Sequence, residues 1–151
     1  MVSKTWSIGI ALIVLFLSSS ALAALGGAAA SVQADQAQMN GTLRTAAATA
    51  AYTQYDIQMP SGTVVREYVS SSGVVFAVAW EGPSLPDLRQ VLGRFFDQYV
   101  QAANAQGGSA GPRLIQLPGL VVNAGGHMRA FFGKAYVPQM LPQGVGPDQI
   151  Q

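Results

Sequence analysis

The sequence feature that most constrains the fold is an unbroken apolar run at residues 74–80, VVFAVAW. Successive side chains of a strand point to opposite faces, so both faces of this run are apolar. A strand of this kind lies in the middle of a sheet and is covered above and below. Alternation places the larger side chains on one face, namely Val74, Phe76, Val78 and Trp80. The smaller side chains of Val75, Ala77 and Ala79 lie on the other face. We expect a helix to approach the smaller face closely.

A corner and an amphipathic helix follow the apolar run. Gly82 and Pro83 end the strand, and Pro86 suits the first turn of a helix, where its missing N–H costs nothing. From Leu88 to Val100, apolar side chains recur with a period of 3.6 residues, which predicts one long helix with an apolar stripe. No phosphate-loop glycines, nucleophile or metal ligands accompany the corner. We therefore interpret it as a structural turn that folds the helix back onto the strand.

Two further pairs of segments have the composition of β-hairpins, and a short helix is predicted before them at residues 28–40. The paired segments are residues 52–59 with 63–69, and residues 114–123 with 127–137. Residues 41–51 are rich in Ala and Thr and fit either a helix or an irregular lead-in. Together these elements predict an α+β fold: a single antiparallel sheet of four to five strands with one long helix packed on one face and a short N-terminal helix.

The first 23 residues have the arrangement of a secretory signal peptide. Lys4 is a lone positive charge, residues 8–17 are wholly apolar, and Ala21 and Ala23 supply the small residues of a cleavage site. We expect residues 1–23 to be removed and the protein to be exported, either to the periplasm or out of the cell. An uncleaved membrane anchor is the alternative, because the next charge after Lys4 is Asp35.

Cleavage would leave a single α+β domain over residues 24–137 and a Pro- and Gly-rich tail over residues 138–151, which we expect to be flexible. No transmembrane span is expected in that mature chain. Its charges balance, since losing Lys4 leaves seven basic and seven acidic residues. Nucleic acid is therefore not an expected partner, because phosphate backbones require a clustered excess of Lys and Arg.

The residue types present exclude several chemistries. The chain has no cysteine and one histidine, so we expect neither disulfides nor a zinc site, and no cofactor or metal is implied. Residues 107–111, GGSAG, match the G-x-S-x-G string of a nucleophile elbow. That elbow joins a strand to a following helix, whereas here a predicted helix precedes the serine and a predicted strand follows it. We assign no catalytic residue.

Arg66 and Glu67 are adjacent in a predicted strand and therefore point to opposite faces. One of the two charges must lie on a largely apolar face, where it needs a partner, a solvent edge or a ligand. The candidate ligand or partner surface consists of the residues Arg66, Glu67, Trp80, Glu81, His127 and Arg129. Structural interpretations stand beside this one: ion pairing for the charged residues, core packing for Trp80, and a turn position for His127.

Several long segments resemble an exported proteobacterial family catalogued as domain of unknown function 2844. They are SGTVVREYV, GVVFAVAWEGPSLPDL, LGRFF and GHMRAFFGKAYVPQMLP, together with the leader and the ALGGAAASVQAD that follows it. The resemblance covers most of the mature chain. It implies a small, exported, single-domain protein, and it carries no activity, ligand or catalytic residue to transfer.

Two hypotheses of function follow. The first is a non-catalytic binding or assembly module of the cell envelope, because one helix covers only one face of the sheet. The other face would then be covered by the N-terminal helix, by a second protomer in a homodimer, or by a protein or apolar ligand of the envelope. The alternative is a small envelope enzyme with a Glu/Arg/His site drawn from Arg66, Glu67, Glu81, His127 and Arg129. The scarcity of reactive residues favours the first.

Overall fold

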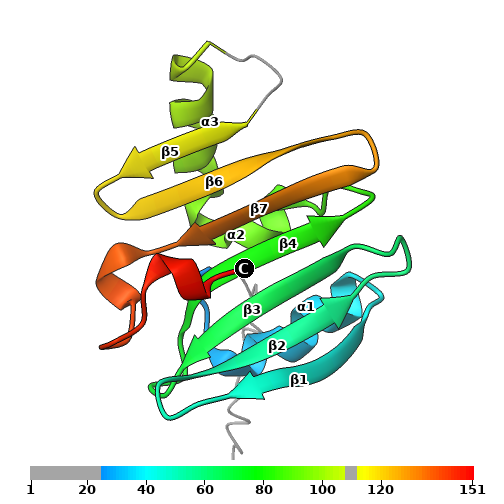
Figure 1. Cartoon of the computed structure of the whole chain (residues 1–151), viewed down its shortest axis with the longest axis vertical. Helices are drawn as coiled ribbons and strands as arrows, with labels where there is room; N and C mark the ends of the chain where they lie inside the picture. Colours follow the sequence, from blue (N-terminus) through cyan, green and yellow to red (C-terminus); the bar gives the residue numbers. More distant parts are fainter. Residues whose placement is uncertain (1–24, 108–111) are drawn as a thin grey trace, which may run out of the picture.

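The computed structural model describes residues 25–107 and 112–151. The predicted signal peptide and Ser109 of the G-x-S-x-G string lie outside these residues. In the described part of the chain, seven strands form one antiparallel sheet with the order β1-β2-β3-β4-β7-β6-β5 (Figure 1). The strands are β1 Thr42–Ala48, β2 Tyr52–Gln58, β3 Val64–Ser70, β4 Val75–Gly82, β5 Arg113–Leu117, β6 Leu120–His127 and β7 Ala130–Tyr136.

The prediction of four to five strands is wrong, although the α+β class holds. Strand β1 occupies the Ala- and Thr-rich segment for which the sequence left helix and irregular structure open. The composition of this segment does not favour a strand, and the backbone hydrogen bonds that it forms with β2 hold it in one. The segment predicted as a single strand at residues 114–123 is instead split by a turn at Pro118 and Gly119 into β5 and the start of β6.

The helical layer lies behind the sheet in Figure 1 and differs from the prediction in one respect. Its elements are η1 Ala29–Ser31, α1 Val32–Gln38, α2 Leu88–Leu92, η2 Gly93–Phe95 and α3 Phe96–Ala105. The predicted long helix is interrupted at Gly93, whose φ of 50° is outside the helical region and is accessible to glycine at little cost. Asp87 caps α2 by accepting hydrogen bonds from the backbone N–H groups of Arg89 and Gln90. No helix of the described residues is long and apolar enough to cross a membrane.

Strand β4 is buried on both faces, but a β-bulge changes which residues share a face. Tyr68 pairs with Ala77 and the next residue, Val69, pairs with Val75, so Phe76 has no partner on β3. As a result, Val75, Val78 and Trp80 belong to the helix-side core, whereas Phe76, Ala77 and Ala79 belong to a second core on the opposite face. The expected grouping of Phe76 with Trp80 is therefore wrong, because simple alternation does not cross a bulge.

The C-terminal segment covers that second core. It folds into η3 Pro138–Met140 and η4 Pro147–Gln149 and lies in front of the sheet in Figure 1. Ile150 is 1% exposed and packs with Phe76 and the two alanines, while Lys134 Nζ donates hydrogen bonds to the carbonyls of Pro147 (2.8 Å) and Ile150 (3.0 Å). This packing differs from the expectation of a loosely attached tail, because the apolar front of β4 requires a cover.

Replacing Ile150 with Ala tests whether the C-terminal segment stabilises the fold. We expect the free energy of unfolding to fall by about 2–5 kcal/mol, as for other fully buried aliphatic side chains. Urea denaturation gives this value, and Leu114→Ala serves as the matched control because Leu114 is 53% exposed. An equally small effect of both substitutions would contradict the packing described here.

Residue 133 has to be a glycine because the side chain of Trp80 occupies the space that a Cβ atom would need. The two residues pair across β4 and β7. A Cβ atom at Gly133 would lie 2.2 Å from Cζ2 of the Trp80 ring. We expect Gly133→Ala to destabilise the fold by about 1–3 kcal/mol through overpacking. Thermal denaturation monitored by Trp80 fluorescence measures the effect. In the control Gly119→Ala, the new methyl group meets nothing within 4 Å, so a loss of similar size there would contradict the steric explanation.

Candidate functional site

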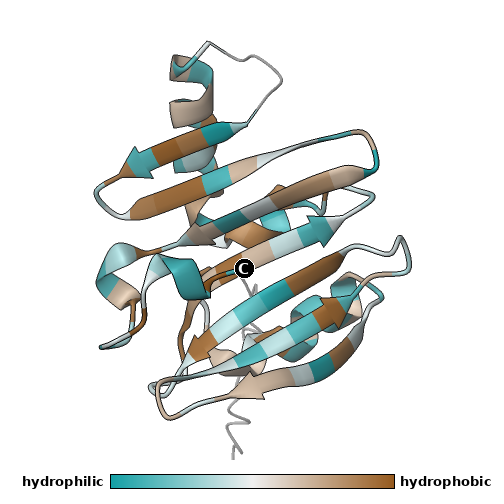
Figure 2. Cartoon of the chain, viewed as in Figure 1, coloured by the Kyte–Doolittle hydropathy of each residue, from teal (hydrophilic) through white to brown (hydrophobic). Residues whose placement is uncertain are grey.

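Arg66 and Glu67 lie on opposite faces of β3, as their adjacency predicts. Figure 2 shows the middle of β3 as a hydrophilic stretch between hydrophobic ends. Glu67 pairs in register with Tyr55 and Val78 and is 1% exposed within the helix-side core. Arg66 lies on the other face, where its side chain keeps partial access to solvent. The charge that has to lie on the apolar face is therefore Glu67.

The partner of Glu67 is a second acid. Asp35 of α1 is 0% exposed, and its Oδ1 accepts a hydrogen bond of 3.1 Å from Nε2 of Gln90 in α2. Among the described residues, Asp35 Oδ2 and Glu67 Oε2 have no N–H donor or hydroxyl to bind. A proton held between the two carboxyl groups supplies the donor that these oxygens lack.

The electrostatics of the pair agree with a shared proton. Burial raises the pKa of Glu67 to about 9, and the neighbouring carboxylate of Asp35 adds to the increase. Burial also raises the pKa of Asp35, while hydrogen bonds from Glu67 and Gln90 act in the opposite direction. Two ionised carboxylates out of contact with water would repel each other strongly. At neutral pH the pair therefore holds a proton at Glu67.

The opposite face of the sheet contains a hollow of about 210 Å³ at the junction of β3, β4 and β7. We call it the front hollow. Its lining residues are Arg66, Trp80, Glu81, Asn123, Phe132, Gly133, Lys134, Ile150 and Gln151. Ala79 lies between Arg66 and Lys134 in the strand register, and its small side chain leaves space between the two long cationic ones. The C-terminal segment, through Ile150 and Gln151, forms one wall.

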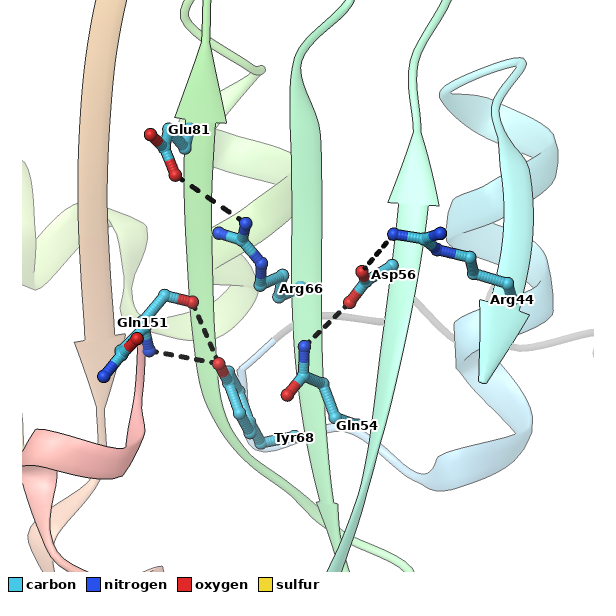
Figure 3. Close-up of polar contacts among 7 residues, drawn as sticks. All are labelled: Arg44, Gln54, Asp56, Arg66, Tyr68, Glu81 and Gln151. Carbon is cyan, nitrogen blue, oxygen red and sulfur yellow. Dashed lines mark hydrogen bonds and ion pairs between the residues drawn. The ribbon is translucent and has the colours of Figure 1, made fainter. Parts of the chain in front are cut away.

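Ion pairs organise the rim of the front hollow (Figure 3). Arg66 Nη2 lies 3.7 Å from Oε2 of Glu81, whose side chain is 69% exposed. Asp56, which faces Arg66 from β2, instead binds Arg44 at 3.1 Å and Gln54 at 2.9 Å. Within the described chain, the ion pair of Arg66 is thus solvent-screened and longer than a good hydrogen bond, which leaves its guanidinium able to bind an incoming acceptor.

A second hollow of about 280 Å³ adjoins the first and shares Glu81 and Phe132 with it. Arg129 contributes to this second hollow from the β6–β7 turn, where its φ is 70°. Phe132 is 47% exposed, so an aromatic side chain stands between the two hollows. Aromatic residues and arginine are enriched at protein–protein interfaces relative to the rest of the surface.

The six candidate residues do not form one site. Arg66 and Glu81 line the front hollow and Arg129 the adjoining one, whereas Glu67 is buried on the other face. Trp80 also borders the front hollow, but it is 1% exposed and belongs to the helix-side core. His127 lines neither hollow, and its Nδ1 lies 3.3 Å from the carbonyl oxygen of Met128 at the hairpin end. The candidate surface derived from the sequence did not include Asp35, Gln90, Phe132 or Lys134.

One of the missed residues had a readable signal. Asp35 is three residues after Val32 and four before Met39, both of which are buried, so it lies on the apolar stripe of α1. The position of Phe132 and Lys134 beside Arg66 and Glu81 could not be predicted, because it depends on β7 pairing with β4 across some 50 residues of chain.

In its described residues, the protein is a small α+β protein with a seven-stranded antiparallel sheet, a buried carboxyl pair behind the sheet, and the front hollow with its neighbour on the other side. The chain belongs to the DUF2844 family of proteins of unknown function, whose family model matches residues 21–150. The resemblance found in the sequence motifs is thereby confirmed. No curated protein and no solved structure matches the chain.

The carboxyl pair predicts an unusual pH dependence of stability. Because the pKa of Glu67 is raised from 4.5 to about 9, the folded state holds one proton more than the unfolded state between these pH values. The contribution is complete below the unfolded pKa and is lost as pH rises toward 9, by at most about 1.4 kcal/mol per pH unit.

Urea denaturation of wild type and Glu67→Gln between pH 5 and 9 measures this dependence. The amide side chain of the variant cannot ionise and keeps an N–H donor for Asp35, so we expect the variant to lose most of the pH dependence. The matched control is Glu81→Gln, because Glu81 is an exposed acid. Equal slopes for wild type and Glu67→Gln would contradict the shared proton.

Proposed function

We propose that this protein is an exported, non-catalytic binding or assembly module of the cell envelope, and that a partner protein docks at the front hollow. The observation that carries the proposal is the exposed Phe132 between two hollows whose rims carry Arg66, Glu81 and Arg129. Export is supported by the sequence of residues 1–23, which has the charge, the apolar stretch and the small residues of a signal peptide.

The size of the front hollow favours a protein partner over a cofactor or a drug-sized ligand. Small-molecule sites usually enclose about 300–1,000 Å³, and the front hollow measures about 210 Å³. That volume accommodates one large side chain of a partner. We propose that this side chain belongs to a segment with an acidic group, which would bind Arg66 and replace its solvent-screened contact with Glu81.

The geometry gives less support to the alternative enzyme hypothesis. Its residues Glu67 and Glu81 lie on opposite faces of the sheet, and His127 lines neither hollow that contains Glu81. A proton-transfer pair requires its members within hydrogen-bond reach of one reacting group.

The homodimer hypothesis was based on a sheet face that a single helix leaves uncovered. The structure gives it less support, because the helices and the C-terminal segment cover both faces of β4 from within the chain.

Site-specific photo-crosslinking in the native cell envelope tests the proposal. A photoreactive phenylalanine analogue at position 132 is expected to give a discrete crosslinked band. The same analogue at position 128 is expected to give none, because Met128 is 84% exposed but lies at the hairpin end outside both hollows. Arg66→Glu, which reverses the charge at the rim, should weaken the band at position 132 by at least about tenfold.

Circular dichroism and thermal denaturation verify that the Arg66→Glu variant is folded. Equal crosslinking at positions 128 and 132, or a band at 132 that is insensitive to Arg66→Glu, would contradict docking at the front hollow. A crosslinked product with twice the mass of the chain would replace the proposed partner with a second copy.

A further inference from the structure

The segment that precedes β1, residues 25–41, is attached to the sheet by a small set of contacts, and we call it the N-terminal arm. Its backbone pairs with the start of β4: Gly26 N–H donates to the Val75 carbonyl at 2.7 Å, and Val75 N–H donates to the Gly27 carbonyl at 2.9 Å. Its apolar contacts are made by Leu25, Val32 and Met39, all of which are buried in the helix-side core.

Asp35 is the single charged residue of the arm, and it lies in the most buried part. It faces Glu67 of β3 and Gln90 of α2, so the arm's polar contact with the sheet is an acid against an acid. Within the described chain, each of the two side chains keeps one carboxyl oxygen without an N–H or hydroxyl donor. Buried polar atoms are rarely left unpaired, so these oxygens require a proton between them.

The charged groups on the neighbouring elements have other partners. In α2, Arg89 lies 3.8 Å from Asp97 and stacks over Phe96. In η2, Arg94 stacks over Phe95.

In the part of the chain that the structure describes, the adjacent strands supply no cation to the pair either. Arg44 of β1 binds Asp56. Tyr55 of β2, which pairs with Glu67, has no cationic group to offer. Removal of the shared proton would therefore leave two buried negative charges uncompensated.

We infer that the Asp35–Glu67 pair is a proton-dependent latch that holds the N-terminal arm on the sheet while one proton is shared and releases the arm when that proton is lost. The inference is independent of the proposed docking at the front hollow, which lies on the other face. Release would expose the apolar side chains of the arm and the helix-side face of β3. The strands would remain paired, because their ladder does not include the arm beyond its bridge to Val74.

Hydrogen exchange with mass spectrometry tests the latch on the mature chain from residue 24. Protection of the arm is compared with that of β3 and β4 at about pH 6 and about pH 10, on either side of the titration of Glu67, after correction for intrinsic exchange rates. The expected result is a loss of protection in the arm of at least about tenfold at the higher pH, with the strands unchanged. Unchanged protection of the arm, or a simultaneous loss in arm and strands, would overturn the inference.

Two variants assign the effect to the pair. Glu67→Gln and Asp35→Asn each remove one ionisable group and should keep the arm protected at about pH 10. Glu81→Gln, an exposed acid on the other face, should behave as wild type. Retention of the wild-type pH response in both pair variants would overturn the latch. If either variant fails to fold, the wild-type comparison of arm and strands decides the question alone. Restoration of arm protection at high pH by millimolar Ca²⁺ would assign the pair to a metal ion in place of a proton.

Discussion

The buried carboxyl pair of Glu67 and Asp35 is the interaction on which we propose that the attachment of the N-terminal arm depends. Three elements meet at it: β3 provides Glu67, α1 provides Asp35, and α2 provides Gln90. An acid in an apolar core is tolerated when it is neutral and hydrogen-bonded. Because its neighbour is another acid, a shared proton has to supply the hydrogen bond between the two carboxyl groups. The position of α1 over the sheet is thus linked to a single titration.

The second constraint is that β4 is apolar on both faces and must be covered twice. The two covers come from the two ends of the described chain. The N-terminal arm and the helices cover Val75, Val78 and Trp80, and the C-terminal segment covers Phe76, Ala77 and Ala79. On the second face, the C-terminal segment forms one wall of the front hollow through Ile150 and Gln151.

Local patterns were sufficient to predict the elements that carry strong periodicity. The two-sided strand, the hairpin at residues 52–69 and the opposite orientation of Arg66 and Glu67 follow from alternation alone. Features that depend on pairing were not predictable. The bulge at Phe76 exists only relative to β3, and β1 is a strand because β2 is beside it. The helix break at Gly93 was partly predictable, because the glycine can be read in the sequence but its φ cannot.

The carboxyl pair was partly predictable from the sequence, whereas the front hollow was not. The need of Glu67 for a partner could be derived from its strand position, and Asp35 could have been found on the buried stripe of α1. That two acids should meet was unexpected, because an opposite charge is the usual partner of a buried carboxylate. The front hollow could not be assembled from the sequence. It requires β7 to lie beside β4, which places Lys134 opposite Arg66 across Ala79, and it requires the C-terminal segment to fold back.

The most direct test of this account is the titration of Glu67 in the wild-type protein, followed by NMR of its side-chain carboxyl carbon. We expect this carbon to keep the chemical shift of a protonated acid at neutral pH and to titrate with a pKa near 9. A Glu67 carboxyl group that titrates near the ordinary value of 4.5 would contradict the shared proton, and with it the explanation of how the N-terminal arm is held.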